Sequence, residues 1–387
     1  MPLMKVCNVR LRDHHFGDAW QTTVENRWNY GDLCADPHWR KDWISFDGVV
    51  HHSGNNRVYC GITSFNADIF WAWDREAEQW IDCGFGDVRD PFDAKFHRSM
   101  QLTADGATLY AATALLHDID RYWTAPGGGL FAHDVSSGKT TKLAIPIPHL
   151  YIQSIALDED RGLIYCMHFT PERMSVFDLH RSETRDLGPL GSGMFMAQGE
   201  NIMLDDDGCA WCGWGLTRAW QNEWGPDAYR LCKYDPVQAR IVYYQTGLPH
   251  RDGSYGFAKV EGLFNFGTGC LYASADNGSL YRIEPDTAES TYLGTPIADR
   301  PSRLTNLVMH ADGCAYGVTG RDGDCRVIRF NPGDDTYELI GDRLVDTEGE
   351  ALYQAHDVCM TPDGTLFAGE NDVPHRSGFL WEITDID

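Results

Sequence analysis

One short turn recurs seven times along this chain of 387 residues, and it constrains the fold more than any other feature. In each copy an apolar run leads into a turn rich in Asp and Gly, and a run containing an aromatic residue follows. The copies lie at residues 51–61, 102–112, 157–167, 204–214, 264–274, 309–319 and 360–370. Such a turn between two apolar runs predicts a β-hairpin, and a spacing near 50 residues predicts a repeated small sheet.

A second hairpin signal follows most copies of the turn: an apolar run ends in an acidic residue or Asn before a polar turn. These signals lie at residues 71–80, 131–140, 176–185, 233–242, 282–291 and 329–338. Two hairpins give four strands, which make one blade of a β-propeller. We therefore predict an all-β fold, a seven-bladed β-propeller with four-stranded blades.

The blades are expected to occupy residues 41–387 of a single domain that covers residues 1–387. The seventh copy reaches only residues 379–387 before the chain ends, so its fourth strand is missing. We expect residues 1–40 to supply that strand, from within residues 5–26. Such a strand closes the ring and leaves no open sheet edge.

Charge and apolar patterning exclude several partners. The formal net charge is −25, from 32 basic and 57 acidic residues, which argues against nucleic acid and against an anionic membrane surface. Apolar runs are far shorter than the roughly 20 residues of a membrane span. The first residues lack the apolar core of a signal peptide, so we expect a cytoplasmic protein, or a secreted one if a leader has been removed.

Polar side chains stand where a plain core strand would be apolar. The innermost strands of a propeller line its axis, so polar residues that lead into them are candidates for one central cavity. They are His97, Arg98, His149, Tyr151, Gln153, Glu200, Glu261, Arg303, Gln354 and His356. A second set follows the aromatic strand of each repeat: His117, His168, Arg173, Trp214, Asp276, Arg321, Glu370 and Asp372.

Two neighbouring repeats hold most of these histidines. His97 and His117 belong to one repeat, and His149, Tyr151 and His168 belong to the next. The start of one antiparallel strand and the end of its neighbour lie at the same edge, so these groups are expected to meet at one mouth of the axis. Imidazole and phenol groups gathered there suit general acid–base catalysis near neutral pH.

At this point the sequence resembles the seven-bladed propeller polysaccharide lyases, namely the ulvan lyases and the related lyase that splits rhamnosyl-glucuronate linkages. The resemblance rests on His97 in FHRS, on His117 twenty residues later in LLHD, and on Tyr151 in HLYIQS. It implies β-elimination on a uronate-containing glycan, with no cofactor needed for the chemistry. Where that family has an arginine for the uronate carboxylate, this chain has His168, with Arg173 a few residues on.

The resemblance implies a division of roles. His97 or His117 with Tyr151 would act as base and acid, with His149 beside the tyrosine. Substrate contacts are expected from His168, Arg173, Arg98, Arg303, Trp214 and Tyr255. Longer inserts at 84–96, 114–129 and 215–230, which hold Trp123, Trp220 and Trp224, are expected to form the rim of the site. Trp123 and Trp214 are expected to stack on sugar rings.

Two other functions fit the same residues. One is a metal-dependent lactonase or sugar-acid hydrolase, in which an axial calcium ion activates water. Its expected calcium ligands are Glu261, Asn306, Asp276 and Asp372. Gln354 and His356 are alternative ligands for manganese, as in propeller oligogalacturonate lyases. The other is a propeller without catalysis, which binds a carbohydrate or a protein.

Overall fold

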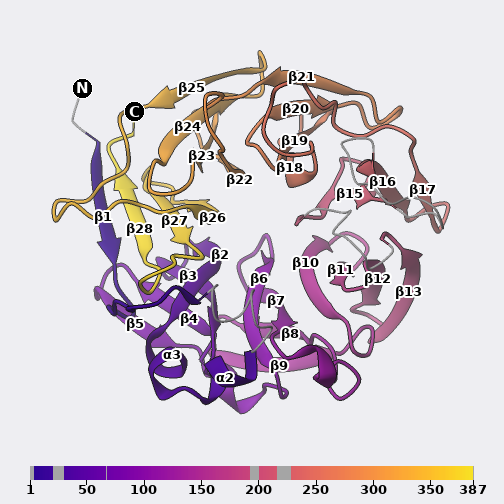
Figure 1. Ribbon diagram of the computed structural model, residues 1–387. Helices are drawn as coiled ribbons and strands as arrows, with labels where there is room; N and C mark the ends of the chain where they lie inside the picture. The colour runs from indigo at the N-terminus through magenta and orange to yellow at the C-terminus, as the bar shows by residue number, and fades with distance from the viewer. Residues whose placement is uncertain (1–3, 21–29, 67, 192–199, 216–227, 387) are drawn as a thin grey trace. The chain divides into compact units, whose positions relative to one another are not determined.

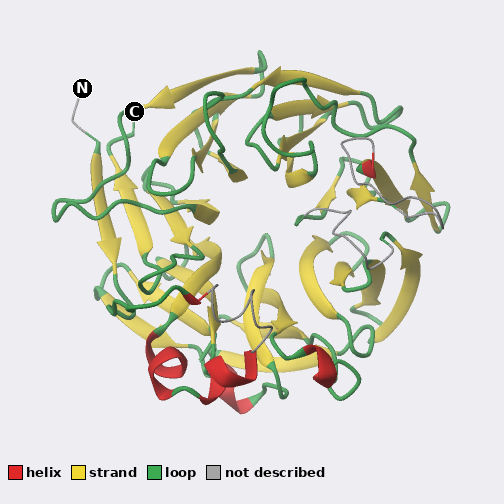
Figure 2. Cartoon of the chain, viewed as in Figure 1, coloured by secondary structure: helices red, strands yellow, loops and turns green. Residues whose placement is uncertain are grey.

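The structure is a computed structural model that describes residues 4–20, 30–66, 68–191, 200–215 and 228–386. Antiparallel strands dominate these residues, and helix is confined to short segments (Figure 2). The chain divides into two compact units, residues 1–152 with 345–387, and residues 153–344. No helix among the described residues has the length and apolar character needed to cross a membrane.

The first unit contains four-stranded antiparallel sheets, labelled in Figure 1. Strands β2 to β5 form one: Ile44–His52, Arg57–Ser64, Phe70–Asp74 and Gln79–Asp82. Strands β6 to β9 form the next: Asp93–Leu102, Thr108–Leu115, Leu130–Asp134 and Lys139–Ala144. A single bridge between Thr63 and Lys95 joins β3 to β6.

The N-terminal strand joins the last strands of the chain. Strand β1 (Lys5–Val9) pairs antiparallel with β28 (Leu380–Thr384), and β27 (Leu366–Glu370) and β26 (Ala355–Met360) follow in the same sheet (Figure 1). The pairing places Lys5 opposite Thr384. The two ends of the chain therefore share one sheet.

The second unit repeats the same arrangement. Strands β10 to β13 are Tyr151–Asp158, Leu163–Phe169, Arg173–Asp178 and Glu183–Pro189. Strands β14 to β17 are Met203–Leu204, Ala210–Trp214, Arg230–Asp235 and Arg240–Tyr243. Strands β18 to β21 are Val260–Asn265, Leu271–Ala275, Leu280–Ile283 and Ser290–Gly294. Strands β22 to β25 are Leu304–Met309, Ala315–Thr319, Arg326–Asn331 and Thr336–Ile340.

Every turn that the sequence predicted lies between two consecutive strands. The turn between β6 and β7 shows the local cause. Asp105 accepts a hydrogen bond from the backbone N–H of Ala107 at 2.9 Å, and Gly106 has φ +73°, where an L side chain would be strained. Because Asp and Gly satisfy the turn locally, the flanking apolar runs are free to pair as strands.

Helices occur mainly between β1 and β2. Helix α2 spans Tyr30–Ala35, and helix α3 spans Pro37–Asp42 (Figure 1). Two 3-10 turns, η1 (Phe85–Asp87) and η2 (Ile119–Arg121), lie in the inserts that the sequence assigned to a rim. These helices belong to the first unit, and periodicity did not predict them because each is only a turn or two long.

Aromatic side chains fill the cores between strands. In the first unit Phe46, Phe70, Phe85 and Phe96 are buried together, and Phe70 meets Phe96 edge-on at 5.6 Å between ring centroids. In the second unit Trp211 is fully buried and stacks on Tyr244 at 5.5 Å. Burying one such side chain stabilises the fold by about 1.5–3 kcal/mol.

Candidate functional site

A buried polar network joins β2, β6 and β26 in the first unit. Asp47 accepts a hydrogen bond from Thr63 Oγ1, and Lys95 Nζ lies 3.1 Å from its Oδ1. His356 Nδ1 bonds the carbonyl oxygen of Asp47 at 2.7 Å. The His97 ring meets the His356 ring edge-on, with centroids 4.5 Å apart. The network therefore brings together two histidines from distant parts of the sequence.

The predicted inner-strand residues of this network are almost completely buried. His97, Arg98 and His356 have exposed fractions of 3%, 7% and 1%. Gln354, two residues before His356, donates from Nε2 to Asn371 Oδ1 at 3.1 Å. Because a carbonyl oxygen only accepts, His356 Nδ1 carries the proton, and Nε2 is the nitrogen that would bind a metal ion.

A second group, which we call the rim cluster, consists of Phe92, His117, Tyr122, Trp123 and His149. Tyr122 lies between the two imidazoles, with centroid distances of 6.4 Å to His117 and 6.4 Å to His149. Trp123 contacts His149 at 5.5 Å, and Phe92 contacts His117 at 5.6 Å. Trp123 is 77% exposed. The rim cluster thus presents one open aromatic face beside two imidazoles.

The glycine-rich loop at residues 125–129 places His149 and Tyr151 at this rim. Gly128 N donates to the carbonyl oxygen of Leu150 at 2.9 Å, just before Tyr151 begins β10. A Cβ atom at Gly128 would lie 2.3 Å from the carbonyl oxygen of Thr113. Only glycine allows this close approach of two backbones, so the loop holds the start of β10 against β7.

Both imidazoles of the rim cluster are oriented by backbone carbonyls. His117 Nδ1 lies 2.9 Å from the carbonyl oxygen of Asp118, and His149 Nδ1 lies 2.8 Å from that of Ala125. Each Nδ1 must be the donor in its hydrogen bond, so Nε2 of each neutral ring carries the lone pair. Burial raises the pKa of Tyr122, which keeps this phenol protonated near neutral pH. The rim cluster therefore offers two bases and one hydroxyl donor.

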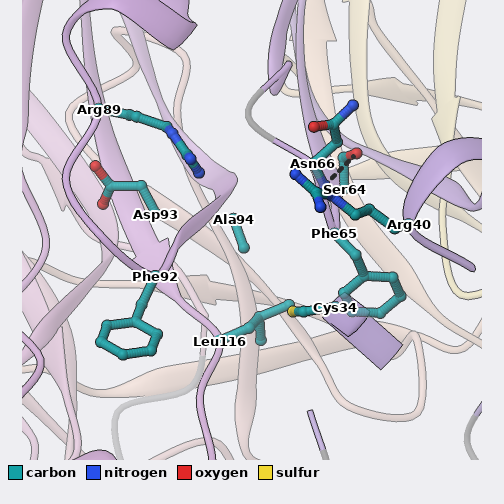
Figure 3. A pocket seen from close by; sticks show the side chains of 10 residues that line it. All are labelled: Cys34, Arg40, Ser64, Phe65, Asn66, Arg89, Phe92, Asp93, Ala94 and Leu116. Atoms are coloured by element: carbon teal, nitrogen blue, oxygen red, sulfur yellow. Dashed lines mark hydrogen bonds between the residues drawn. The ribbon is translucent and has the colours of Figure 1, made fainter. Parts of the chain in front are cut away.

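A pocket of about 200 Å³ lies next to the rim cluster (Figure 3). Figure 3 shows Arg89 and Asp93 on one side and Arg40, Ser64 and Asn66 on the other. Its remaining lining residues are Cys34, Phe65, Phe92, Ala94 and Leu116. Two cations thus face one small polar space.

The two arginines of this pocket are exposed, whereas its aspartate is buried and hydrogen-bonded. Arg40 and Arg89 are exposed, and neither guanidinium makes an ion pair or hydrogen bond with a residue that the structure describes. Asp93 is 2% exposed, and its Oδ2 accepts from Asp90 N at 2.7 Å. Burial raises the pKa of Asp93 to about 6, so this carboxyl takes up its proton at a higher pH than an ordinary aspartate does.

Phe92 connects the pocket to the rim cluster. Its side chain lines the pocket and also contacts the His117 ring. Its carbonyl oxygen accepts from Leu116 N at 3.1 Å, and its φ of +74° is unusual for a residue with a side chain. Phe92 therefore lies between the pocket and His117 of the rim cluster.

The carboxylate-binding residues predicted from sequence are committed to other partners. His168 is fully buried on β11, and its Nε2 lies 2.7 Å from Ser175 Oγ, so it does not line a surface that a ligand reaches. Arg173 forms an ion pair with Asp186 on β13. Its Nε and Nη2 atoms donate to Oδ2 of Asp186 at 3.1 and 2.8 Å. These contacts replace the expected clamp of His168 and Arg173.

Arg303 is also engaged within the second unit. Its Nε donates to Glu261 Oε1 at 2.8 Å, and an Nη atom donates to Glu200 Oε2 at 3.0 Å. Two carboxylates surround one guanidinium, so the group carries a net negative charge. A uronate carboxylate would have to displace a protein carboxylate to bind there, which makes Arg303 a poor clamp.

Trp214 and Tyr255, the predicted sugar contacts of the second unit, differ in exposure. Trp214 donates from Nε1 to the carbonyl oxygen of Tyr244 at 3.0 Å, and Arg230 lies over its ring at 5.7 Å. Tyr255 is 46% exposed and lines a pocket of about 180 Å³ together with Arg251. Tyr255 is therefore the more accessible of the two.

The residues expected to bind calcium are bonded locally. Glu261 is paired with Arg303, and Asn306 Oδ1 accepts from Leu307 N at 2.8 Å. Asp276 accepts from Phe257 N at 3.0 Å, and burial raises its pKa. Asp372 Oδ2 accepts from Asn371 Nδ2 at 3.1 Å. Trp220 and Trp224, expected at the rim, lie outside the described residues.

Sequence reasoning missed three residues of this surface: Arg40, Arg89 and Tyr122. Arg89 and Tyr122 lie in inserts that had been assigned to the rim, so loop length was a usable signal for both. Arg40 lies in α3, within the segment expected only to close the ring. Its approach to Arg89 depends on how α3 packs and has no local sequence signal.

No protein-family model matches this sequence, and no curated protein matches it. Solved structures do match. The extracellular domain of BT4673 from B. thetaiotaomicron aligns with 88% of this chain at 12% identity and a TM-score of 0.58, and this chain covers 38% of that one. U3-55K aligns with 89% of this chain and 97% of its own, at 11% identity and a TM-score of 0.58.

The WD40 repeats of RRP9 are similar too, over 89% of this chain and 96% of their own, at 10% identity and a TM-score of 0.59. WD40 repeats build β-propellers. The likeness and the four-stranded antiparallel sheets together show that this chain has an all-β fold of the β-propeller type.

Proposed function

We propose that this protein is a lyase that cleaves a uronate-containing poly- or oligosaccharide by β-elimination at the rim cluster. The observation that carries the proposal is the pair of imidazoles, His117 and His149. Both are held through Nδ1 by backbone carbonyls, and both flank Tyr122 next to a pocket lined by Arg40 and Arg89, which form no ion pair with a residue that the structure describes.

We also propose that the propeller has seven blades and that β1 closes the ring. The four-stranded order recurs with each predicted repeat, which supports the count. The antiparallel pairing of β1 with β28 supports the closure, because it completes the sheet that β26 begins. A closed ring leaves no open edge at the seam.

The reaction transfers two protons, one to a base and one from an acid, and it breaks one carbon–hydrogen bond and one carbon–oxygen bond. A neutral imidazole Nε2 of the rim cluster removes the C5 proton of the uronate, and the electron pair of that C–H bond forms the C4–C5 double bond. The C4–O4 bond breaks, and O4 leaves with a proton from an acid. His117 or His149 acts as the base, and Tyr122, which lies beside both imidazoles, or Tyr151 at the start of β10 acts as the acid.

The arginine pocket would hold the uronate carboxylate. Removing the C5 proton spreads negative charge onto that carboxylate, so a cation beside it stabilises the transition state more than the ground state. Arg40 and Arg89 would do this, and the proposal is supported by their place in the pocket lining and by the lack of an ion pair with any described residue. This arrangement takes the role that His168, Arg173 and Arg303 were expected to fill.

The test incubates the full chain with a panel of uronate-containing polysaccharides and records ultraviolet absorbance of the unsaturated product. On a cleaved substrate, at least one of H117Q and H149Q should lower kcat by about 10²–10⁴-fold, because one of the two imidazoles acts as the general base. H180Q is the matched control, because His180 is exposed in a turn of the second unit. Its rate should equal that of the unsubstituted chain.

The pocket has its own test on the same substrate. R89Q should lower kcat/KM by about 10–100-fold, which corresponds to the loss of one hydrogen bond to a charged group. R181Q is the control, because Arg181 is an exposed arginine paired with Asp178. Full activity of H117Q, H149Q and R89Q would remove the rim cluster and the pocket from the mechanism.

A binding function is the second candidate, and the exposure of Trp123 favours it. An aromatic ring that is 77% exposed beside other aromatic groups is suited to stack on a sugar. If the panel yields no unsaturated product but a polysaccharide binds, and W123A weakens that binding, the protein is a carbohydrate-binding propeller. Activity on sugar lactones that chelation abolishes would instead support the metal-dependent hydrolase.

A further inference from the structure

Two histidines and an aspartate meet where the N-terminal segment crosses helix α3. His38 and Asp42 are four residues apart on α3, so their side chains share one face of the helix. His14 comes from the segment that follows β1. The ligand atoms of these three side chains all lie within 4.8 Å of one another, and the two imidazole centroids are 4.5 Å apart.

The backbone of each of these residues is held independently of its side chain. Asp36 caps α3 by accepting from His38 N at 2.8 Å. Ser377 N donates to the carbonyl oxygen of His14 at 3.0 Å, and Ser377 Oγ donates to that of Asp42 at 2.5 Å. One serine therefore fixes the segment that carries His14 and the end of the helix that carries Asp42.

Aromatic packing fixes the same two elements against each other. The ring of Phe16 stacks on Trp39 of α3 with centroids 4.3 Å apart and an interplanar angle of 6°. Trp39 and Phe16 are both buried. Arg12 interacts electrostatically with Asp42, but no described residue makes a hydrogen bond to the side chain of His14, His38 or Asp42, so all three can face a ligand that lies between them.

We propose that His14, His38 and Asp42 bind one divalent transition-metal ion of the zinc class. Two imidazole nitrogens and one carboxylate oxygen suit Zn²⁺, whereas Ca²⁺ and Mg²⁺ prefer oxygen donors alone. Three protein ligands leave the fourth tetrahedral position to water. Ligand atoms around zinc are about 3.3 Å apart, so side-chain rotation must close the present separations by up to about 1.5 Å.

Such an ion would link the N-terminal segment to α3 and thereby stabilise the region around the arginine pocket, because Arg40 also lies on α3. The proposal does not depend on lyase activity. It concerns binding of a metal ion to these three side chains, and its measurements use no carbohydrate.

The test uses the full chain, freed of metal with a chelator and titrated with Zn²⁺ by calorimetry and with Co²⁺ by visible absorbance. The unsubstituted chain should bind one ion with the intense d–d bands of tetrahedral cobalt. H14Q and H38Q should each weaken binding at least 10-fold. H310Q is the matched control, because His310 lies 3.5 Å from Asp312 without a second imidazole, and it should bind like the unsubstituted chain.

A thermal melt shows whether a variant has lost metal binding because it no longer folds. Metal-free H38Q should melt at the temperature of the metal-free unsubstituted chain, because His38 is exposed. Added Zn²⁺ should raise the melting temperature of the unsubstituted chain but not that of H38Q. The proposal would be overturned if the unsubstituted chain did not bind zinc. It would also be overturned if H14Q and H38Q bound zinc as tightly as the unsubstituted chain does. Cobalt bands typical of thiolate ligands would overturn it as well, because they would place the ion on cysteine.

Discussion

Asp93 gives the most quantitative prediction, because it is an acid buried beside the arginine pocket. Its side chain is 2% exposed, and burial is the largest cause that raises its pKa from 3.8 to about 6. The N–H of Asp90 lowers the pKa but does not offset burial. The ionised form of Asp93 therefore destabilises the folded chain relative to the unfolded one.

The size and sign of this effect follow from linkage. In the folded chain Asp93 keeps its proton up to about pH 6, whereas in the unfolded chain it loses the proton near pH 4. Stability should fall as pH rises from about 4 to about 6 and change little from this group above that range. Each unit of pKa difference corresponds to about 1.4 kcal/mol, so ionised Asp93 lowers the free energy of unfolding by about 3 kcal/mol at neutral pH.

The substitution D93N removes the titration while keeping the shape of the side chain. Urea unfolding followed by tryptophan fluorescence at pH 4 and pH 7 measures the free energy of unfolding. The advantage of D93N over the unsubstituted chain should be about 2 kcal/mol larger at pH 7 than at pH 4, where the aspartate of the unfolded chain is already about half ionised. D286N is the control, because Asp286 is exposed in a turn. A D93N difference that is the same at both pH values would refute this account of the burial of Asp93.

Two further predictions concern packing and a buried ion pair. G128A should destabilise the fold by about 1–3 kcal/mol, because its Cβ atom would lie 2.3 Å from a backbone oxygen. G17A is the control and should have little effect, because no atom lies within 4 Å of the Cβ position at Gly17. The midpoints of urea unfolding measure both effects. R376M should cost about 3–5 kcal/mol in the same assay, because it leaves Glu370 buried without the guanidinium that binds both its oxygens at 2.7 and 2.8 Å. An unchanged midpoint for G128A would contradict the close backbone approach at Gly128. An unchanged midpoint for R376M would contradict the buried ion pair of Arg376 with Glu370.

Much of the fold followed from local sequence rules. Each Asp/Gly turn satisfies its own backbone, as Asp105 and Gly106 do, so the strands on either side could be placed from the sequence without knowing the rest of the molecule. A fourth strand from the N-terminal segment was also predicted, and β1 does pair with β28.

The candidate site followed from sequence only in part. His117, His149 and Tyr151 were predicted as a group, and the structure places the two histidines on either side of Tyr122. His97 was predicted with them but packs against His356 in a buried network. Strand order indicates which end of a strand a residue occupies, but packing decides whether its side chain reaches solvent.

Only the tertiary structure decided which cations are available. Sequence reasoning selected Arg173 and Arg303 and did not select Arg40 or Arg89, yet the first two meet carboxylates and the second two line a pocket. The repeat, the turns and the strands are encoded within about ten residues, so the sequence by itself determined them. The partner of each charge lies far away in the chain, so only the packing of distant segments determined which charges remain unpaired.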